Sequence, residues 1–177
     1  MYSMLQKLRK KMNQKIGILS DTHLYGVSEH FRQHSEIAFK SCDTIIHAGD
    51  ITDMEILKVF RGKTVFAVHG NMCGQATRKA LPESRILSMN GYKIAVCHGT
   101  GSRYDIEERL YRRFHNVDCI VYGHTHQPVS HRSCGILYIN PGSFQGTGRY
   151  GSPGTYAVLT TGVNTLSAEL QSLPCRQ

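Results

Sequence analysis

The feature that most constrains this chain is a short apolar run, residues 118–122, that ends in the turn Gly123-His124-Thr125-His126. A short apolar run bounded by a turn is typical of a buried strand. Two histidines one residue apart are poorly suited to a core, and neutral imidazole is the commonest metal ligand among side chains. The turn therefore predicts a place where two imidazoles converge, and it indicates a metal site.

The same arrangement, an apolar run followed by ligand-type residues, occurs five times along the chain. The runs cover residues 15–19, 44–47, 64–68, 92–97 and 118–122, and the residues that follow them are Asp21 and His23, Asp50, Asn71, His98, and His124 with His126. Singly, each has an ordinary interpretation, such as a helix cap for Asp50 or a turn residue for Asn71. Those interpretations do not explain why ligand-type residues follow all five predicted strands. Their joint occurrence favours one site at the carboxyl ends of the strands.

The chemistry of this set limits the metal and the reaction. It offers two carboxylates, four imidazoles and one amide oxygen, too many for one tetrahedral zinc and too mixed for a calcium cage. The set suits two transition-metal ions that share a bridging carboxylate, without selecting among Mn²⁺, Fe²⁺, Zn²⁺, Co²⁺ and Ni²⁺. Two such ions about 3.5–4 Å apart hold a water as hydroxide and draw charge from phosphoryl oxygens. The sequence therefore predicts hydrolysis of phosphate esters.

The pattern of the remaining segments indicates an α/β fold. Helices are expected over residues 29–41, 53–60 and 104–115, and hairpins over residues 84–97, 129–139 and 155–170, the first of them turning at Asn90-Gly91. Residues 144–154 are rich in glycine and are expected to form a mobile loop. Because early strands alternate with helices and later strands come in hairpins, we expect two mixed sheets with helices outside. A single doubly wound sheet is the alternative.

Composition narrows the organisation and the partners. The 177 residues, 40% hydrophobic, fit one globular domain. The net charge of +8 points toward nucleic acid, but five of the 21 basic residues stand in an acid-free leading stretch: Lys7, Arg9, Lys10, Lys11 and Lys15. The other 16 basic and 13 acidic residues leave only +3. We expect a basic tail over residues 1–14, a single domain over residues 15–177, and no preference for nucleic acid.

The cysteines and the hydropathy bear on location. The six cysteines show no C-x-x-C pair and no regular spacing, and Cys97 and Cys119 lie inside apolar runs, where cysteine behaves as a small hydrophobe. A reducing, cytoplasmic setting is therefore expected rather than a disulfide framework. No run approaches the roughly 20 apolar residues that span a bilayer, and residues 1–14 lack the apolar segment of a secretory signal, so no membrane contact is expected.

The five motifs resemble those of the calcineurin-like metallophosphoesterase superfamily. They are Asp21-x-His23, Gly49-Asp50, Gly70-Asn71, His98-Gly99 and the turn 123–126, and the later Asn140-Pro141-Gly142-Ser143 is similar to the small prokaryotic phosphodiesterase branch. The resemblance covers roughly residues 15–170. It implies a four-layer α/β/β/α sandwich and two divalent ions, with Mn²⁺ favoured and Ni²⁺, Fe²⁺, Zn²⁺, Co²⁺ or Mg²⁺ as alternatives.

The resemblance also implies a role for each residue. One ion is held by Asp21, His23 and His126, the other by Asn71, His98 and His124, and Asp50 bridges them. Asp50, Asn71 and His98 are then the catalytic residues, and Asn71 with Arg103 contacts the substrate phosphate. For Arg103, a solvated position at a helix start is the ordinary alternative. His47 and His69 are candidates for orienting the ligands.

One departure concerns the leaving group. Many members of the family follow Gly-Asn with a histidine, where this chain has Met72. A thioether cannot donate a proton, so we expect activated aryl phosphodiesters to be better substrates than alkyl ones. Cys73 is either a weak acid that substitutes for the histidine or a structural cysteine.

Three functions stay open at this stage. The leading one is a phosphodiesterase acting on a small or nucleotide-like phosphate ester. The second is a non-catalytic interaction scaffold, because the fold resembles a retromer subunit. The third is a nuclease, which the weak charge of the domain does not favour. Tyrosine and phenylalanine side chains in residues 104–122 also make a homo-oligomer an expectation, and specificity is expected in residues 72–84 and in the loop after Ser143.

Overall fold

The computed structural model describes residues 13–146 and 152–174. Most of the predicted tail, residues 1–12, lies outside the described residues, and so does the middle of the predicted loop, residues 147–151. The first strand, β1 (Gln14–Leu19), begins one residue before the predicted boundary of the domain.

The first sheet contains five strands in the order β10-β9-β1-β2-β3. Its members are β1, β2 (Thr44–His47), β3 (Thr64–Ala67), β9 (Thr155–Gly162) and β10 (Thr165–Ser172). The three early strands run parallel, with Ile16 opposite Thr44 and Thr44 opposite Thr64, and the last two form an antiparallel hairpin that continues the sheet beyond β1. Sequential parallel strands therefore direct the ends of β1, β2 and β3 to one edge.

The second sheet also contains five strands, in the order β4-β5-β6-β8-β7. They are β4 (Ser84–Met89), β5 (Tyr92–Cys97), β6 (Cys119–Val121), β7 (Val129–Ser133) and β8 (Ile136–Asn140). Its three central strands are parallel, and an antiparallel strand closes each side. The prediction of two mixed sheets is confirmed, and the doubly wound alternative is wrong because no strand of the first sheet pairs with one of the second in the described chain.

Four helical segments accompany the sheets within residues 13–146 and 152–174: α2 (Glu29–Ala38), the 3₁₀ helix η1 (Met54–Phe60), α3 (Gln75–Ala80) and α4 (Ile106–Arg113). Ser28 accepts the Phe31 N–H and so caps α2, and Asp53 accepts the Glu55 N–H and so caps η1. Two expectations need correction. Residues 54–60 form a 3₁₀ helix. Helix α3 was not predicted, because Thr77 is its one buried side chain and the segment therefore shows no apolar face in the sequence.

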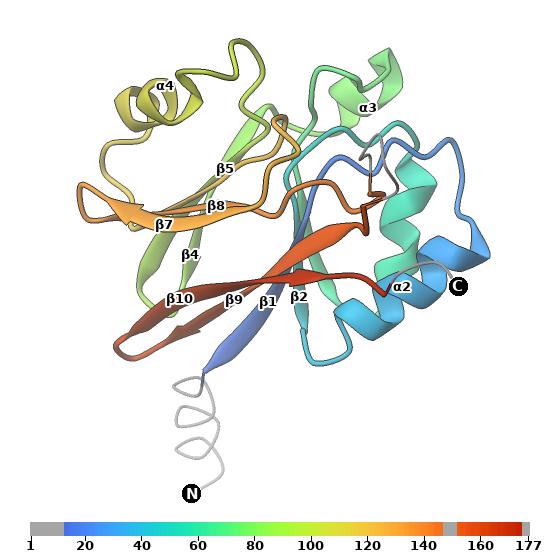
Figure 1. Ribbon diagram of the computed structural model, residues 1–177, viewed down its shortest axis with the longest axis horizontal. Coiled ribbons are helices and arrows are strands. Elements are labelled where there is room, and N and C mark those ends of the chain that lie inside the picture. Colours follow the sequence, from blue (N-terminus) through green and yellow to red (C-terminus); the bar gives the residue numbers. More distant parts are fainter. Residues whose placement is uncertain (1–12, 147–151, 175–177) are drawn as a thin grey trace, which may run out of the picture.

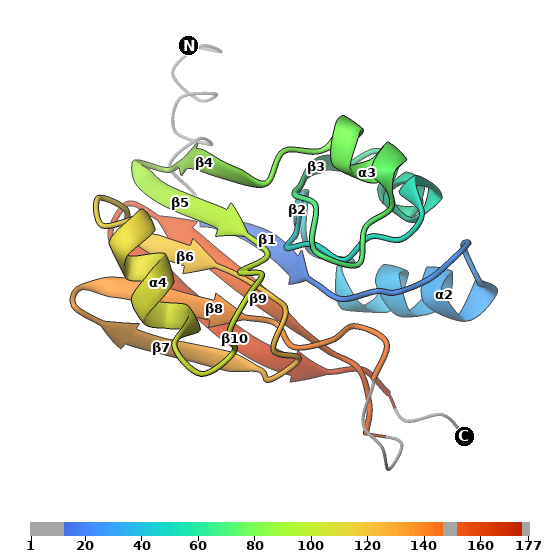
Figure 2. The ribbon, with the colours of Figure 1, turned by 90° about the horizontal axis from the view of Figure 1, so that it is seen from above.

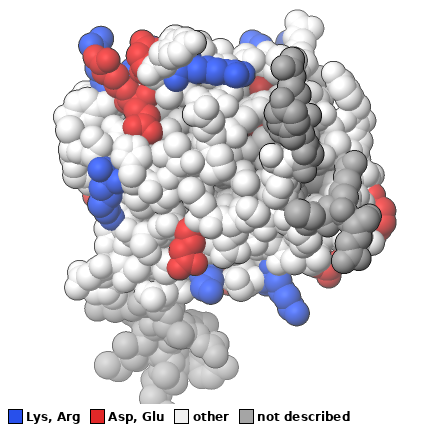
Figure 3. Space-filling model, viewed as in Figure 1, with Lys and Arg blue, Asp and Glu red and all other residues white. Residues whose placement is uncertain are grey.

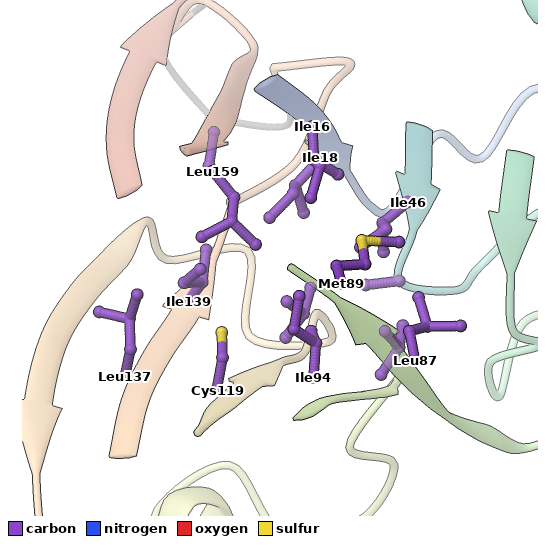
Figure 4. Close-up of a cluster of buried hydrophobic side chains, with 14 of the residues drawn as sticks. Ile16, Ile18, Ile46, Leu87, Met89, Ile94, Cys119, Leu137, Ile139 and Leu159 are labelled. Carbon is purple, nitrogen blue, oxygen red and sulfur yellow. The ribbon is translucent and has the colours of Figure 1, made fainter. Parts of the chain in front are cut away.

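Three hydrophobic clusters separate four layers. The central cluster joins the facing sides of the two sheets, with Ile16 and Ile18 opposite side chains such as Ile94 and Ile139 (Figure 4). Figures 1 and 2 show α2 outside the first sheet and α4 outside the second. Because side chains alternate along a strand, β1 turns Gly17 toward the outer side, where an added Cβ would lie only 2.3 Å from the Phe39 ring. The layered α/β/β/α order expected from the sequence is therefore present.

Helix α4, which lies within the helix predicted over residues 104–115, covers the second sheet with Ile106 and Leu110, and Phe114 at its end packs there too. Phe114 is consequently buried, and Tyr122 is buried under the same helix. The exposed aromatic side chains of residues 104–122 are Tyr104 and Tyr111 alone, so the surface expected to support an oligomer is smaller than the sequence indicated. None of the helices in the described ranges is long and apolar enough to cross a bilayer.

Candidate metal centre

The predicted ligands lie in five loops, each of which follows the carboxyl end of a parallel strand. Asp21 and His23 follow β1, Asp50 follows β2, Asn71 follows β3, His98 follows β5, and His124 with His126 follow β6. Loops of both sheets touch here: the His124 N–H donates to Asp21 Oδ2 over 3.1 Å, and the Gly123 N–H donates to the His98 carbonyl over 3.2 Å. The fold therefore brings residues more than 100 positions apart to one edge.

A first compact group consists of Asp21, His23 and His126, whose ligand atoms all lie within 4.8 Å of one another. His126 Nε2 is 3.0 Å from Asp21 Oδ1, and His23 Nε2 is 3.6 Å from the same oxygen. The two imidazole Nε2 atoms are 3.3 Å apart. Two ring nitrogens and a carboxylate oxygen that converge on one point form a donor set suited to a divalent transition metal.

A second compact group consists of Asp21, Asp50 and His98. Asp50 Oδ2 lies 3.2 Å from His98 Nε2 and 3.9 Å from His23 Nε2, so this oxygen stands between the two groups. Asp21 Oδ1 is also 3.9 Å from His98 Nε2. Asp21 belongs to both groups, and Asp50 Oδ2 lies between His98 and His23, so both carboxylates connect the two groups.

Two buried atoms of the site lack hydrogen-bond partners. They are Asn71 Oδ1 and His98 Nε2, and among the described residues Ser35 Oγ is the one other such side-chain atom. His98 Nδ1 lies 2.8 Å from the Ala48 carbonyl oxygen, which can only accept, so Nδ1 carries the proton and Nε2 presents its lone pair. A buried unpaired acceptor costs roughly 1–3 kcal/mol unless an ion or a water satisfies it. These two orphaned acceptors fit a bound cation.

His124 is the remaining predicted ligand. Its ring centroid is 5.3 Å from that of His98, and its Nε2 lies 2.9 Å from the Gly101 carbonyl oxygen. Since that oxygen can only accept, Nε2 carries the proton and Nδ1 is the nitrogen free to bind a metal. Arg103 lies exposed in the loop after β5, and no hydrogen bond or ion pair joins its side chain to another described residue.

Backbone strain is concentrated at this site. Asp21, His23, Asp50, His124 and His126 have φ angles between 47° and 68°. Within residues 13–146 and 152–174, the other non-glycine residues with positive φ are Asn90 and Cys134, both in hairpin turns. The left-handed conformation costs an L-residue about 1–2 kcal/mol. Strain gathered at one place marks a functional site, because stability alone gives no reason to retain it.

Glycines beside the ligands permit the close approach of the loops. A Cβ on Gly70 would lie 2.2 Å from Asp50 Oδ1, and a Cβ on Gly123 would lie 2.0 Å from Ser20 Oγ. Both distances are shorter than any real Cβ contact, so no other residue fits without displacing the ligand loops. The glycines in the sequence motifs therefore have a packing reason.

His47 supports Asp50 from behind. Its Nδ1 accepts the Gly49 N–H over 3.3 Å, and its Nε2 lies 3.3 Å from Thr22 Oγ1, whose hydroxyl in turn donates to the Asp50 carbonyl over 3.4 Å. Burial lowers the pKa of His47 to about 3, so the imidazole stays neutral and keeps one tautomer. His47 is therefore placed to orient the loop that carries Asp50, the role for which the sequence made it a candidate.

The sequence did not reveal the role of the segment after β8. Asn140 is fully buried, and its Nδ2 donates to the Gly123 carbonyl over 2.8 Å and to Thr125 Oγ1 over 2.9 Å. Its Oδ1 accepts the Gly142 N–H over 2.9 Å. Ser143 donates its hydroxyl to the Asp21 carbonyl over 3.0 Å. The segment thus fastens the two loops that carry Asp21 and His124. The sequence Asn-Pro-Gly-Ser was the feature from which this role could have been suspected.

Mutual contacts shift the pKa values of the metal-free cluster. Burial acts to raise the pKa of Asp21, but hydrogen bonds with His126 and His23 outweigh it and hold that pKa far below its ordinary value. Burial likewise opposes ionisation of Asp50, yet contact with His98 lowers the pKa of this carboxyl. Both carboxylates therefore stay ionised at neutral pH, which concentrates negative charge where cations are expected.

Met72 occupies the position where many members of the family have a histidine, and Cys73 follows it. The Met72 side chain is 57% exposed, while its backbone N–H donates to Asp50 Oδ1. Cys73 is buried, and its sulfur accepts the Gly70 N–H over 3.2 Å. The thiol thus has a structural contact inside the turn, in keeping with the structural interpretation of Cys73.

Comparison with known proteins identifies the relatives. The family model of the calcineurin-like phosphoesterase superfamily domain matches residues 14–164. A probable metallophosphoesterase of Methanocaldococcus jannaschii is 40% identical over 134 residues, covering 72% of this chain and 67% of the relative. A phosphodiesterase of the same organism is 30% identical over 145 residues, covering 72% of this chain and 82% of the relative.

A solved structure shares the architecture. Vacuolar protein sorting 29 of Cryptosporidium parvum is 19% identical and superposes with a TM-score of 0.69, covering 90% of this chain and 98% of that protein. At this identity the similarity concerns the fold alone. The family model spans most of the chain, including all seven predicted ligands, and both relatives described above are at least 30% identical to it. The chain therefore belongs to the calcineurin-like phosphoesterase superfamily.

Proposed function

We propose that this protein is a metal-dependent phosphodiesterase that uses two divalent ions to hydrolyse small or nucleotide-like phosphate esters. The observation that supports this most is the pair of overlapping ligand groups, Asp21–His23–His126 and Asp21–Asp50–His98, beside the orphaned acceptor of Asn71. A scaffold gains nothing from buried unpaired acceptors and strained backbone, whereas a metal site uses both.

The donor set determines which residues would hold each ion. Asp21, His23 and His126 would hold one, Asn71, His98 and His124 the other, and Asp50 would bridge them. When bound, such a pair lowers the pKa of a water to near neutrality and draws charge from phosphoryl oxygens. Mixed nitrogen and oxygen donors suit several divalent metals and do not select among them. We propose Mn²⁺ first, in line with the family resemblance, with Ni²⁺, Fe²⁺, Zn²⁺, Co²⁺ or Mg²⁺ as alternatives.

The chain's own residues position the reacting groups. The His47 network holds the main chain at Asp50, through the Thr22 hydroxyl and the Gly49 N–H, and the Met72 N–H holds the Asp50 carboxylate at Oδ1. Arg78 donates to the Asn71 carbonyl over 2.7 Å and to the Cys73 carbonyl over 2.9 Å, and so stiffens the turn that carries Asn71. Fixed donors and acceptors of this kind supply catalysis through preorganisation. Arg103 is the remaining candidate for contact with the phosphate.

The lack of a proton donor at Met72 bears on the substrate. Cys73 is buried inside its turn, where its sulfur accepts the Gly70 N–H, and the Met72 thioether has no proton to give. We therefore propose a preference for esters whose alcohol leaves as a stable anion, such as aryl phosphodiesters.

The test is hydrolysis of bis-p-nitrophenyl phosphate after chelation and return of Mn²⁺, Ni²⁺ or Mg²⁺. We expect activity that depends on the returned metal and falls at least about 100-fold in Asp50→Ala, since even residues that merely orient ligands contribute about 10–100-fold. Asp43→Ala removes an exposed carboxylate at the turn before β2 and is the matched control. A chain that binds no metal would reject the proposal.

The same assay separates the alternatives. Two bound ions without turnover of any diester would favour the interaction scaffold, for which the likeness to vacuolar protein sorting 29 supplies the fold alone. For a nuclease, DNA and RNA hydrolysis should be compared with and without residues 1–14. The described basic and acidic side chains on the face in Figure 3 are interspersed, which gives little support to a nucleic-acid surface there.

A further inference from the structure

Beyond His98, the loop between β5 and α4 contacts the candidate centre through the Gly101 carbonyl oxygen, which lies 2.9 Å from His124 Nε2. We infer that Arg109 is a positioning residue that holds this loop against His124 and so fixes which imidazole nitrogen faces the centre. The inference rests on the proposed two-metal site and adds to it a residue that no sequence motif contains.

The guanidinium of Arg109 binds the loop at several points. Its Nη1 donates to the Thr100 carbonyl over 3.1 Å, and its Nη2 donates to the carbonyls of Gly99, over 3.4 Å, and of Ser102. Its Nε donates to Asp105 Oδ1 over 3.3 Å. All three nitrogens of one side chain therefore contact one short loop. The planar fork of arginine permits this, whereas the single ammonium of lysine cannot span the same acceptors.

The loop needs such a clamp. Residues 100–105 are exposed, so no apolar side chain anchors them to a core. Gly99 and Gly101 have φ angles of 85° and 120°. Glycine adopts positive and negative φ angles about equally well, so these two residues do not by themselves hold the loop in one conformation. Arg109 thus supplies order that the loop sequence lacks.

The order of the loop determines the state of His124. A carbonyl oxygen accepts only, so its contact keeps the proton on Nε2 and leaves the lone pair on Nδ1. Without the contact the ring is free to change tautomer and orientation. Arg109 also lines, with His98 and His69, a pocket of about 80 Å³. Arg109 therefore shares a pocket with His98, and it binds the residues on both sides of Gly101, whose carbonyl contacts His124.

The sign of the expected effect distinguishes positioning from charge. Removing a positive charge near a cation site strengthens cation binding if Coulomb interaction alone is at work. Loss of positioning weakens it instead. A decrease of metal affinity in Arg109→Gln is therefore not explained by the charge, and it is the result that the inference requires.

The first experiment is calorimetric titration of the chelated full chain with Mn²⁺. In Arg109→Gln we expect one of the two ions to bind about 10–100-fold more weakly, the range for residues that orient metal ligands, with the other changed less than about twofold. Arg109→Lys should not restore the affinity. Arg112→Gln, on the same helix and paired with Glu108, is the control and should bind as the wild type does. Unchanged or stronger binding in Arg109→Gln would overturn the inference.

A thermodynamic cycle and a metal-free readout complete the test. In a His124→Ala background, Arg109→Gln should have no further effect on metal affinity; a second full loss would contradict action through His124. In the metal-free chain, ¹⁵N NMR should show His124 protonated at Nε2 in the wild type and a mixture of tautomers in Arg109→Gln. Identical tautomers would reject the inference. Absence of metal binding by the wild type would reject the proposed function instead, while the NMR comparison still tests Arg109.

Discussion

The backbone N–H of Met72 donates to Oδ1 of Asp50 over 2.8 Å, while the Met72 side chain points to solvent. The residue that replaces the expected histidine is thus part of the centre through its main chain alone. Every residue except proline can occupy position 72 without loss of that backbone hydrogen bond, so a different side chain there can change how the leaving group departs.

Met72→His should therefore change the substrate range. A placed general acid contributes about 10²–10⁴-fold, so we expect kcat/KM for alkyl phosphodiesters to rise at least about tenfold, with little change for p-nitrophenyl esters, whose leaving group needs no proton. The measurement is kcat/KM across a series of diesters of increasing leaving-group pKa, with Met72→Gln as a polar control that cannot act as the acid. Equal wild-type rates on alkyl and aryl diesters would contradict the premise.

Asn140→Ala should destabilise the chelated protein. The change removes three hydrogen bonds of a fully buried amide, those with Gly123, Thr125 and Gly142. At about 1 kcal/mol for each net bond, we expect the free energy of unfolding to fall by roughly 2–4 kcal/mol in urea titrations. Gln127→Ala, exposed in the neighbouring turn, should change it by less than about 0.5 kcal/mol. Similar losses in the two variants would show that Asn140 does not fasten the turn.

His47 should make the metal-free protein sensitive to acid. Burial lowers its pKa to about 3 from an ordinary 6.5, so the unfolded chain binds a proton that the folded chain refuses. The stability that this difference contributes is complete above pH 6.5 and is lost as the pH falls toward 3. Linkage gives a loss of about 2 kcal/mol between pH 7 and pH 5.

The comparison that isolates this effect is wild type against His47→Gln, because the raised pKa values of His23 and His98 act in the opposite direction in both proteins. Urea unfolding at pH 7 and pH 5 should show the wild type losing about 2 kcal/mol more than the variant. A variant with the same pH dependence as the wild type would remove His47 as the cause.

The sequence predicted what is encoded locally. A buried strand that stops at a polar residue is visible within ten residues, so Asp21, Asp50 and His98 could be placed at strand ends without knowledge of the fold. The hairpin at Asn90-Gly91 is equally local. The division of the strands into two sheets depends on contacts between distant segments. It could be predicted because the early strands alternate with helices whereas the later strands form hairpins.

The sequence could not reveal residues that act across the fold. Asn140 fastens a turn 17 positions away, and Arg109 holds a loop through carbonyl groups that every residue possesses. Neither interaction leaves a pattern in the side chains of the loop that is held. Helix α3 was missed for a related reason. A helix is predicted from the apolar face that it buries, and α3 has no such face.

The three hairpin turns lie at the opposite end of the strands from the metal centre. The turn at Asn90-Gly91 precedes β5, the turn at Cys134-Gly135 precedes β8, and the turn of residues 163–164 follows β9, which runs against β1. Cys134 is exposed, whereas the other cysteines of the described residues are buried. A surface tether attached through this thiol would therefore immobilise the protein with the candidate metal centre facing solution, and a fluorophore there would label the molecule at the end away from that centre.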